Sequence, residues 1–222
     1  MTDVSPFDGR PVFLGIGNRL RVREDEINSA IEHVAQQASR YHRMVARYQI
    51  TLRSAGRFRE MGEAIQTDWD RDLAQSLVES VQILDQFQDD RATYVLATVE
   101  GIPELPMFTL SWKMQDGEPE WVTRPPRVPG YIAAVGAARR FRQYRDSMDH
   151  ADQAALQEVL MQMGAGVQAA EGRVAIDGLG SLDESYSVQN SSAEINNFLV
   201  VARYTPENGS YFYSLVLARR KD

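Results

Sequence analysis

The feature that most constrains the fold of this chain is the recurrence of similar segments at one spacing. VFLGIGNRLRVRE and YIAAVGAARRFRQ are both short apolar runs that contain a glycine and continue into a basic stretch. Their glycines, Gly17 and Gly136, are 119 residues apart, and the same 119 residues separate Tyr94 in YVLATV from Tyr213 in YSLVLA. Self-similarity at a fixed period is typical of a repeated structural unit. The sequence therefore predicts a duplicated unit.

The same order of secondary structure is predicted in both halves. Apolar residues at helical spacing predict helices over 23–43 and 148–159, the second shifted by two residues against the repeat. Alternation in ARYQITLRS predicts a strand, a short helix is expected over 69–78, and VQILDQFQDDRATYVLATVE and FLVVARYTPENGSYFYSLVLA predict hairpins. We therefore expect an α+β fold, a tandem repeat of two similar units (1–118 and 119–222), each a helix packed on a small antiparallel or mixed sheet.

A proline-rich segment lies at the expected boundary between the units. Before it, the alternating residues of MFTLSWKM predict a strand that bridges the two units. After it, Trp121 is expected to be a buried anchor, and Pro125 and Pro126 form a stiff lead-in that limits the freedom of the unfolded chain. Gly136, like Gly17 in the first unit, is expected in a tight turn between a strand and a helix.

The residues around this boundary form a pattern of a tryptophan, a proline pair and a Gly-Tyr followed by an apolar strand that closes in Val-Gly. They are Trp121, Pro125, Pro126, Gly130, Tyr131, Val135 and Gly136. On this pattern the second unit resembles the Lpp-twenty-type family, small bacterial envelope lipoproteins named for a twenty-kilodalton member. The first unit is similar through LGIGN and VQILDQFQDDRATYVLATVE, although it lacks the tryptophan and the proline pair. A related unit occurs in FlgT-type flagellar assembly proteins.

The resemblance implies a lipoprotein of the bacterial cell envelope, in the periplasm or at the outer membrane. Such proteins carry their lipid on an N-terminal cysteine, and this chain contains no cysteine. The expectation is therefore that the signal and the lipidated residue precede Met1, with a cytoplasmic location as the alternative. The matching residues serve packing and turns, so the resemblance implies binding or assembly and supplies no catalytic residue.

Composition narrows the chemistry further. Without cysteine there are no disulfides, zinc–thiolate sites or cysteine nucleophiles. The net charge of −7 argues against a surface for nucleic acid or anionic membrane, unless a local basic patch overrides the balance. We therefore expect no nucleic-acid partner, and membrane attachment only through a lipid anchor.

Local basic patches follow the first predicted strand of each unit. The arginines in them are Arg19, Arg21, Arg23, Arg139, Arg140, Arg142 and Arg145. Arginines at the entrance to a helix can bind an anion or contact a partner, and all of these except Arg19 are our candidate contact residues. The alternative is a solvated turn in which the arginines pair with acids such as Glu24 and Asp146, which would reveal little about function.

Three other motifs are incomplete. GIGNRL has a leucine where a dinucleotide fingerprint needs a third small residue. DWDRDLAQSLVE spaces carboxylates like a calcium loop but has Leu73 in place of the required glycine, which favours a helix start capped by Thr67 or Asp68. His33 and His42 lie nine residues apart and face opposite sides of the first helix. We expect no cofactor, no metal site and no catalytic residue.

These features favour a non-enzymatic envelope protein that acts by protein–protein binding or assembly, through a sheet edge or the groove between units. The competing hypothesis is a soluble small-molecule or anion-binding module that uses the arginine-rich turns. The sequence leaves open which envelope protein is the partner and whether the chain forms a homo-oligomer.

Overall fold

The structure is a computed structural model that describes residues 2–3, 9–55, 58–105, 110–163, 168–174 and 184–220. Within these ranges three α-helices combine with antiparallel sheets, so the chain is α+β as expected. The elements are β1 (Thr2–Asp3), β2 (Phe13–Asn18), α1 (Arg23–His42), β3 (Met44–Ala55), β4 (Phe58–Trp69), α2 (Arg71–Leu77), β5 (Val81–Gln88), β6 (Ala92–Val99), β7 (Met114–Gln115), β8 (Glu118–Pro119), β9 (Ile132–Arg139), α3 (Tyr144–Gln162), β10 (Gln168–Val174), β11 (Glu184–Tyr204) and β12 (Tyr211–Arg220).

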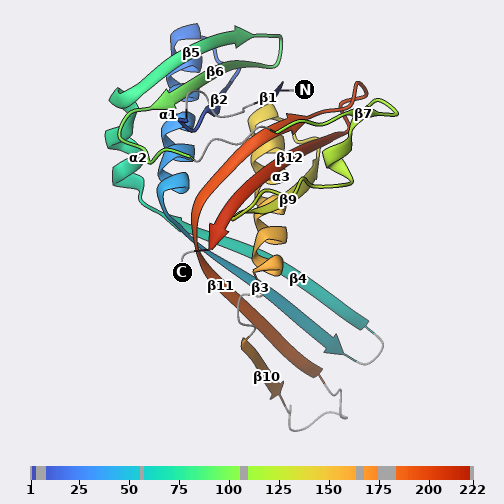
Figure 1. The fold of residues 1–222 in the computed structure, drawn as a ribbon. Helices are drawn as coiled ribbons and strands as arrows, with labels where there is room; N and C mark the ends of the chain where they lie inside the picture. Colours follow the sequence, from blue (N-terminus) through green and yellow to red (C-terminus); the bar gives the residue numbers. More distant parts are fainter. Residues whose placement is uncertain are drawn as a thin grey trace.

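The strands form two main sheets. The larger has the order β4-β3-β11-β12-β9, with β1 and β10 also paired to β11, and the smaller has the order β2-β6-β5. In Figure 1 the first half of β11 extends away from the helices together with β3, β4 and β10, and these strands make a long arm. Strand β12 lies between β11 and β9 in the larger sheet.

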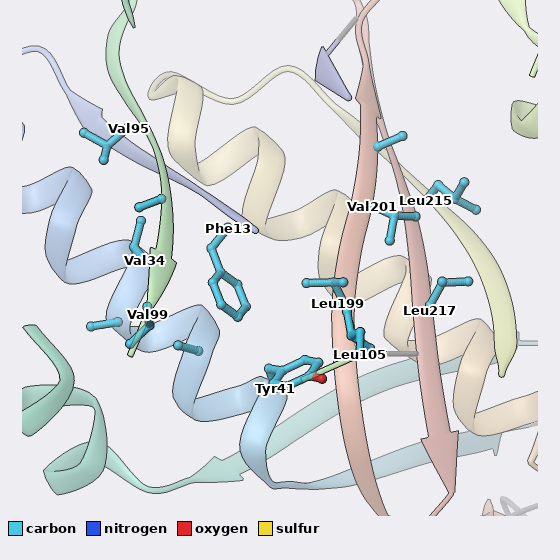
Figure 2. Packing of buried hydrophobic residues seen from close by; sticks show 14 of the residues in the cluster. Phe13, Val34, Tyr41, Val95, Val99, Leu105, Leu199, Val201, Leu215 and Leu217 are labelled. Atoms are coloured by element: carbon cyan, nitrogen blue, oxygen red, sulfur yellow. The ribbon is translucent and has the colours of Figure 1, made fainter. Parts of the chain in front are cut away.

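The two long helices connect the sheets. Helix α1 packs mainly on β2 and β6 and also contacts β11, whereas α3 packs mainly on β9 and β12 and also contacts β2. Figure 2 shows the shared core, in which Phe13 and Tyr41 meet edge to face with ring centroids 5.9 Å apart, close to Leu199 of the larger sheet. Each such side chain stabilises the fold by about 1.5–3 kcal/mol when fully buried. The core therefore joins residues from both halves of the sequence.

The glycines of the repeated segments lie inside strands, and the expectation of tight turns at Gly17 and Gly136 is wrong. A Cβ atom at Gly136 would lie 2.1 Å from the backbone oxygen of Ala151 and 2.1 Å from the backbone nitrogen of Ala155. A Cβ atom at Gly17 would lie 2.0 Å from the backbone oxygen of Glu26. These strands need glycine because a helix backbone lies directly against them.

The segment between the halves is anchored by Trp121 as predicted. Its side chain is buried, and its ring meets Trp112 edge to face at 6.3 Å. Pro125 and Pro126, by contrast, are exposed and half-buried respectively. Of the strand predicted for MFTLSWKM, residues 107–109 lie outside the described part, 110–113 have no regular structure, and only the last residue enters β7, which pairs with β8.

The remaining predicted elements are confirmed with small shifts. Helices α1 and α3 cover the two predicted helices, and α3 begins four residues earlier than predicted, at Tyr144. Both predicted hairpins form, as β5–β6 and β11–β12. Asp70 caps α2 in place of Thr67 or Asp68, because its carboxylate accepts the backbone N–H of Leu73 at 2.8 Å.

Two general features follow from the described residues alone. No group of three or more His, Asp or Glu side chains in this part of the chain is placed to hold a metal ion. Among the helices that the structure describes, none is both long and apolar enough to cross a membrane.

Candidate functional site

The two arginine-rich segments, distant in sequence, lie side by side. We call residues 19–23, from the end of β2 to the first residue of α1, basic loop 1. We call residues 139–143, from the last residue of β9 to the start of α3, basic loop 2. Asn18 joins them: its amide nitrogen donates to Oε1 of Gln143 at 2.9 Å, and its side-chain oxygen accepts the backbone N–H of Arg145 at 3.2 Å. The starts of α1 and α3 also lie at the same end of the molecule, away from the arm (Figure 1).

Basic loop 1 is ordered by the buried carboxylate of Glu26. This carboxylate accepts hydrogen bonds from the Thr93 hydroxyl at 2.7 Å, the backbone N–H of Leu20 at 3.0 Å and the Arg19 guanidinium at 3.0 Å. The hydrogen bond from Thr93, followed by those from Leu20 and Arg19, lowers the pKa of Glu26 to about 2. Arg19 also donates to the backbone oxygen of Asp89, so both terminal nitrogens of its guanidinium are bonded within the fold.

Arg145, next to basic loop 2, is also engaged within the fold. Its guanidinium lies 3.4 Å from the carboxylate of Asp149, one helical turn away, and donates to Oε1 of Gln36 on α1 at 3.0 Å. Arg145 therefore fixes α3 against α1. Of the six candidate contact residues, it is the one that the structure assigns a structural role.

The other five candidates are exposed and have no acidic partner among the described residues. They are Arg21, Arg23, Arg139, Arg140 and Arg142. The expected pairing of the arginines with Glu24 and Asp146 is therefore wrong: Arg19 pairs with Glu26, Arg145 pairs with Asp149, and the remaining charges face solvent. Five unpaired cations lie on two adjoining loops of a chain whose net charge is −7.

Exposed apolar side chains alternate with these arginines. In basic loop 1, Leu20 is 52% exposed and Val22 is 50% exposed. In basic loop 2, Phe141 is exposed on one side while its ring stacks on His150 at a centroid distance of 4.0 Å. Single exposed apolar residues are common, but their placement between unpaired cations in two adjoining loops is unusual. The sequence shows that Phe141 lies between arginines. Sequence analysis did not predict that Leu20 and Val22 are exposed.

A buried polar cluster lies behind the loops, between α1 and α3. Nδ1 of His33 accepts the backbone N–H of Ile16 at 3.1 Å, and Nε2 lies 3.3 Å from the carboxylate of Asp149. An acceptor at Nδ1 requires that the neutral ring carry its proton on Nε2. Burial lowers the pKa of His33, although the carboxylate of Asp149 opposes this effect. The sequence correctly separates His33 from His42 but does not reveal this cluster.

A buried ion pair continues the cluster into the larger sheet. The guanidinium of Arg203 donates two hydrogen bonds to the carboxylate of Asp152, both of 2.8 Å, and a longer one to the Ser214 hydroxyl at 3.4 Å. Arg203 is 1% exposed. The pair links α3 to β11 and orients the helix on the sheet, which is a structural role.

An apolar groove lies beside β5. It has a volume of about 350 Å³ and is lined by Leu14, Phe87, Tyr94, Leu96 and Tyr144, with Asp85 and Asp89 contributing acidic groups. Phe87 is 61% exposed and stacks on Tyr94 at 5.7 Å. A second cavity of about 460 Å³ lies where β4 meets α1, and its lining is more polar. None of the five unpaired arginines lines either cavity.

The exposed surfaces of the described residues are suited to contact with another molecule, whereas the titratable groups between α1, α3 and β11 are bound within the fold. Both ring nitrogens of His33 face protein groups, and the half-buried carboxylate of Asp149 and the buried carboxylate of Asp152 face arginine or histidine side chains. The exposed apolar and basic side chains described above lie at two places, the β5 edge with its groove and the two basic loops. No family model, no curated protein and no solved structure matches this chain.

Proposed function

We propose that this chain is a non-enzymatic binding or assembly protein of the bacterial cell envelope that recognises a partner protein through the edge of strand β5. The single observation that carries the proposal is an edge strand with exposed apolar side chains beside an open apolar groove. A sheet edge offers unpaired backbone groups, and a groove next to it selects among side chains.

Strand β5 has the properties of a binding edge. It is last in the order β2-β6-β5, so within the described residues only β6 pairs with it. Ile83, Leu84 and Phe87 on this strand are all exposed. Proteins usually protect such an edge with charges, prolines or bulges, and here an irregularity between Ile83 and Asp85 interrupts the pairing with β6. The rest of the strand remains free to accept an added strand.

The groove indicates which partner segment would fit. Its apolar lining and its volume of about 350 Å³ suit one or two large apolar side chains of an extended segment. Asp85 and Asp89 add negative charge to the same groove, which favours a basic residue next to the apolar ones. The proposed ligand is therefore an extended segment of an envelope protein with apolar and basic residues.

Two similar units, 1–118 and 119–222, form part of this proposal. In support of it, β2 pairs antiparallel with β6 as β9 pairs with β12. Ile16 lies opposite Tyr94, and Ala137 lies opposite Tyr213. A Cβ at Gly15 would meet Ala30 and Val34, whereas one at Gly136 would meet Ala151 and Ala155. Four pairs of positions are offset by 121 residues: Gly15 and Gly136, Ile16 and Ala137, Ala30 and Ala151, and Val34 and Ala155. This offset makes Gly15, and not Gly17, the counterpart of Gly136.

The envelope location rests on the resemblance to the Lpp-twenty-type lipoproteins and their FlgT-type relatives. The buried Trp121 and the close approach of α3 to Gly136 support a packing role for the residues of that pattern. On this proposal a lipidated cysteine preceding the chain holds the protein at the periplasmic or outer-membrane surface, where β5 meets its partner.

The test is site-specific photocrosslinking in cells that express the protein. A photoreactive residue in place of Phe87 or Leu84 is expected to capture one envelope protein, and a peptide from the captured region should bind the purified chain. The matched control is Met114, which is 55% exposed on β7 and lies away from the groove. Binding of the peptide that survives Leu84→Lys and Phe87→Lys would refute the role of β5.

A second candidate is a soluble module that binds a small anion through the arginine-rich turns. The five exposed arginines without acidic partners favour it. It predicts that titration with inorganic phosphate or a nucleotide gives a saturable signal that Arg140→Gln and Arg142→Gln remove. The β5 proposal predicts no such signal.

A further inference from the structure

The two basic loops share a pattern that the proposed function does not use. Leu20 and Val22 alternate with the arginines of basic loop 1, and Phe141 lies between Arg140 and Arg142 in basic loop 2. The three apolar side chains are exposed. Of the arginines beside them, only Arg19 has an acidic partner among the described residues. Each loop thus offers apolar groups flanked by free cations.

The structure holds the two loops together in a preformed shape. Asn18 bonds to both Gln143 and Arg145, so the loops adjoin. Glu26 fixes the backbone of Leu20, and the Ser147 hydroxyl accepts the backbone N–H of Phe141 at 2.9 Å. The loops therefore need little ordering when they meet a partner, which lowers the entropic cost of binding.

The charge of this surface differs from that of the whole chain. Five unpaired arginines lie on the loops, and α1 and α3 direct their positive dipole ends toward the same end of the molecule (Figure 1). Glu24, Asp25 and Asp146, in the first turns of the helices, offset part of this charge. The net charge of −7 argued against an anionic membrane surface unless a local patch overrides it, and the two loops are such a patch.

We propose that the two basic loops bind the surface of an anionic phospholipid bilayer directly. At the boundary between headgroups and hydrocarbon, Leu20, Val22 and Phe141 would contact acyl chains while the arginines beside them bind lipid phosphates. A nucleic acid would use the cations, but it offers aliphatic side chains such as Leu20 and Val22 no comparable apolar medium. A bilayer uses both parts of the pattern.

This inference goes beyond the proposed function and does not depend on it. The lipid-binding surface lies on the loops before α1 and α3, whereas the proposed partner site lies on β5. Direct binding also differs from the expected attachment through a lipid anchor, because it needs only side chains of this chain. A protein held at the bilayer by both the lipid anchor and the two basic loops would present the arm on the side away from the bilayer (Figure 1).

The first experiment measures charge dependence by sedimentation with vesicles. The purified chain is expected to bind vesicles of phosphatidylcholine mixed with phosphatidylglycerol, and to bind pure phosphatidylcholine vesicles much more weakly. Replacing Arg140 and Arg142 by Gln should weaken binding about fivefold for each arginine removed. The matched control is Arg124→Gln with Arg127→Gln, two exposed arginines on another loop, which should leave binding unchanged.

The second experiment tests the apolar part. Leu20→Ser and Phe141→Ser should weaken vesicle binding and make the remaining binding more sensitive to salt. Met161→Ser is the control, since Met161 is 49% exposed at the other end of α3. Equal binding to neutral vesicles, full binding by the serine variants, or loss of vesicle binding in millimolar inorganic phosphate at constant ionic strength would overturn the proposal. Tighter binding to RNA than to anionic vesicles would overturn it as well.

Discussion

The side-chain oxygen of Asn18 accepts the backbone N–H of Arg145 at 3.2 Å, and this bond joins residues 127 positions apart. It connects the end of β2 to the first turn of α3, and the amide of the same residue reaches Gln143. Two loops that look like separate surface turns in the sequence thereby form one surface. The surface proposed to bind lipid thus depends on a contact between the two halves of the chain.

Asn18→Ala is expected to lower the free energy of unfolding by about 1–2 kcal/mol, because two partly exposed hydrogen bonds of about 0.5–1.5 kcal/mol each are lost. Urea denaturation measures the change. The control is Asn28→Ala, an exposed position on α1, where alanine should be neutral or slightly stabilising. If both substitutions have the same effect, the bond between the loops contributes nothing to stability.

The buried ion pair of Arg203 and Asp152 predicts a non-additive pair of substitutions. Asp152→Leu should cost about 3–5 kcal/mol, since it leaves the Arg203 guanidinium buried without its carboxylate. Replacing both residues together, Arg203→Met with Asp152→Leu, should recover much of this loss because no buried charge remains.

Urea denaturation of the single and double variants gives the coupling energy between the two residues. Purely additive effects would contradict the assignment of the pair as a buried unit.

Glu26 predicts a loss of stability in acid. Its pKa of about 2 in the folded chain lies below the ordinary value of 4.5, so the ionised form stabilises the fold. That stabilisation is complete above pH 4.5 and is lost as the pH falls from 4.5 toward 2. Thermal melts across this range should show a smaller acid-induced decrease in Tm for Glu26→Gln than for the unmodified chain. A parallel decrease in both would exclude Glu26 as a source of the acid sensitivity.

His33 should act in a separate pH window. Burial lowers its pKa below 6.5, so the unfolded chain binds the proton more readily than the folded one, and stability falls as the pH drops below 6.5. His33→Gln can keep an acceptor near the N–H of Ile16 but cannot titrate. Its Tm should therefore change less between neutral pH and pH 5 than the Tm of the unmodified chain. A change as large as in the unmodified chain would rule out titration of His33 as the cause.

Sequence patterns predicted the elements better than their contacts. Periodicity identified both long helices and both hairpins because burial of one face dictates the spacing of apolar residues. The glycines were assigned to turns because a sequence does not show that a helix backbone lies 2.1 Å from a Cβ position at Gly136. The arginines were expected to pair with the nearest acids, whereas Arg19 and Arg145 pair with Glu26 and Asp149, farther along the helices.

The contacts between the two halves of the chain could not be predicted from the sequence either. Periodicity along α1 shows which face is apolar but not which element covers it, and here β11, from the other half of the chain, does so in part. The polar cluster around His33 and Asp149 forms only when two helices meet. A single histidine on a helix carries no local signal that distinguishes such a cluster from an isolated core residue. If the two halves are similar units, as proposed, the offset of 119 taken from Tyr94 and Tyr213 becomes 121 for the strand and helix positions, and only the contacts reveal this.

The close approach of a helix backbone to Gly15 and to Gly136 predicts that neither glycine tolerates substitution. Gly136→Ala places a methyl group 2.1 Å from backbone atoms of α3, and Gly15→Ala places one 2.0 Å from the backbone oxygen of Ala30. Because backbone atoms cannot rotate away as a side chain can, each helix must move off its strand, at a cost of about 3 kcal/mol or more.

Gly130→Ala is the matched control for these substitutions. Gly130 has a φ of +78° and no neighbouring atoms within 4 Å of a Cβ, so alanine there meets only backbone strain of about 1 kcal/mol. Urea midpoints should therefore fall much further for Gly15→Ala and Gly136→Ala than for Gly130→Ala. If Gly136→Ala were no more destabilising than Gly130→Ala, α3 would not lie directly on β9. The close strand–helix approach that makes Gly15 and Gly136 counterparts would then be lost as support for two similar units.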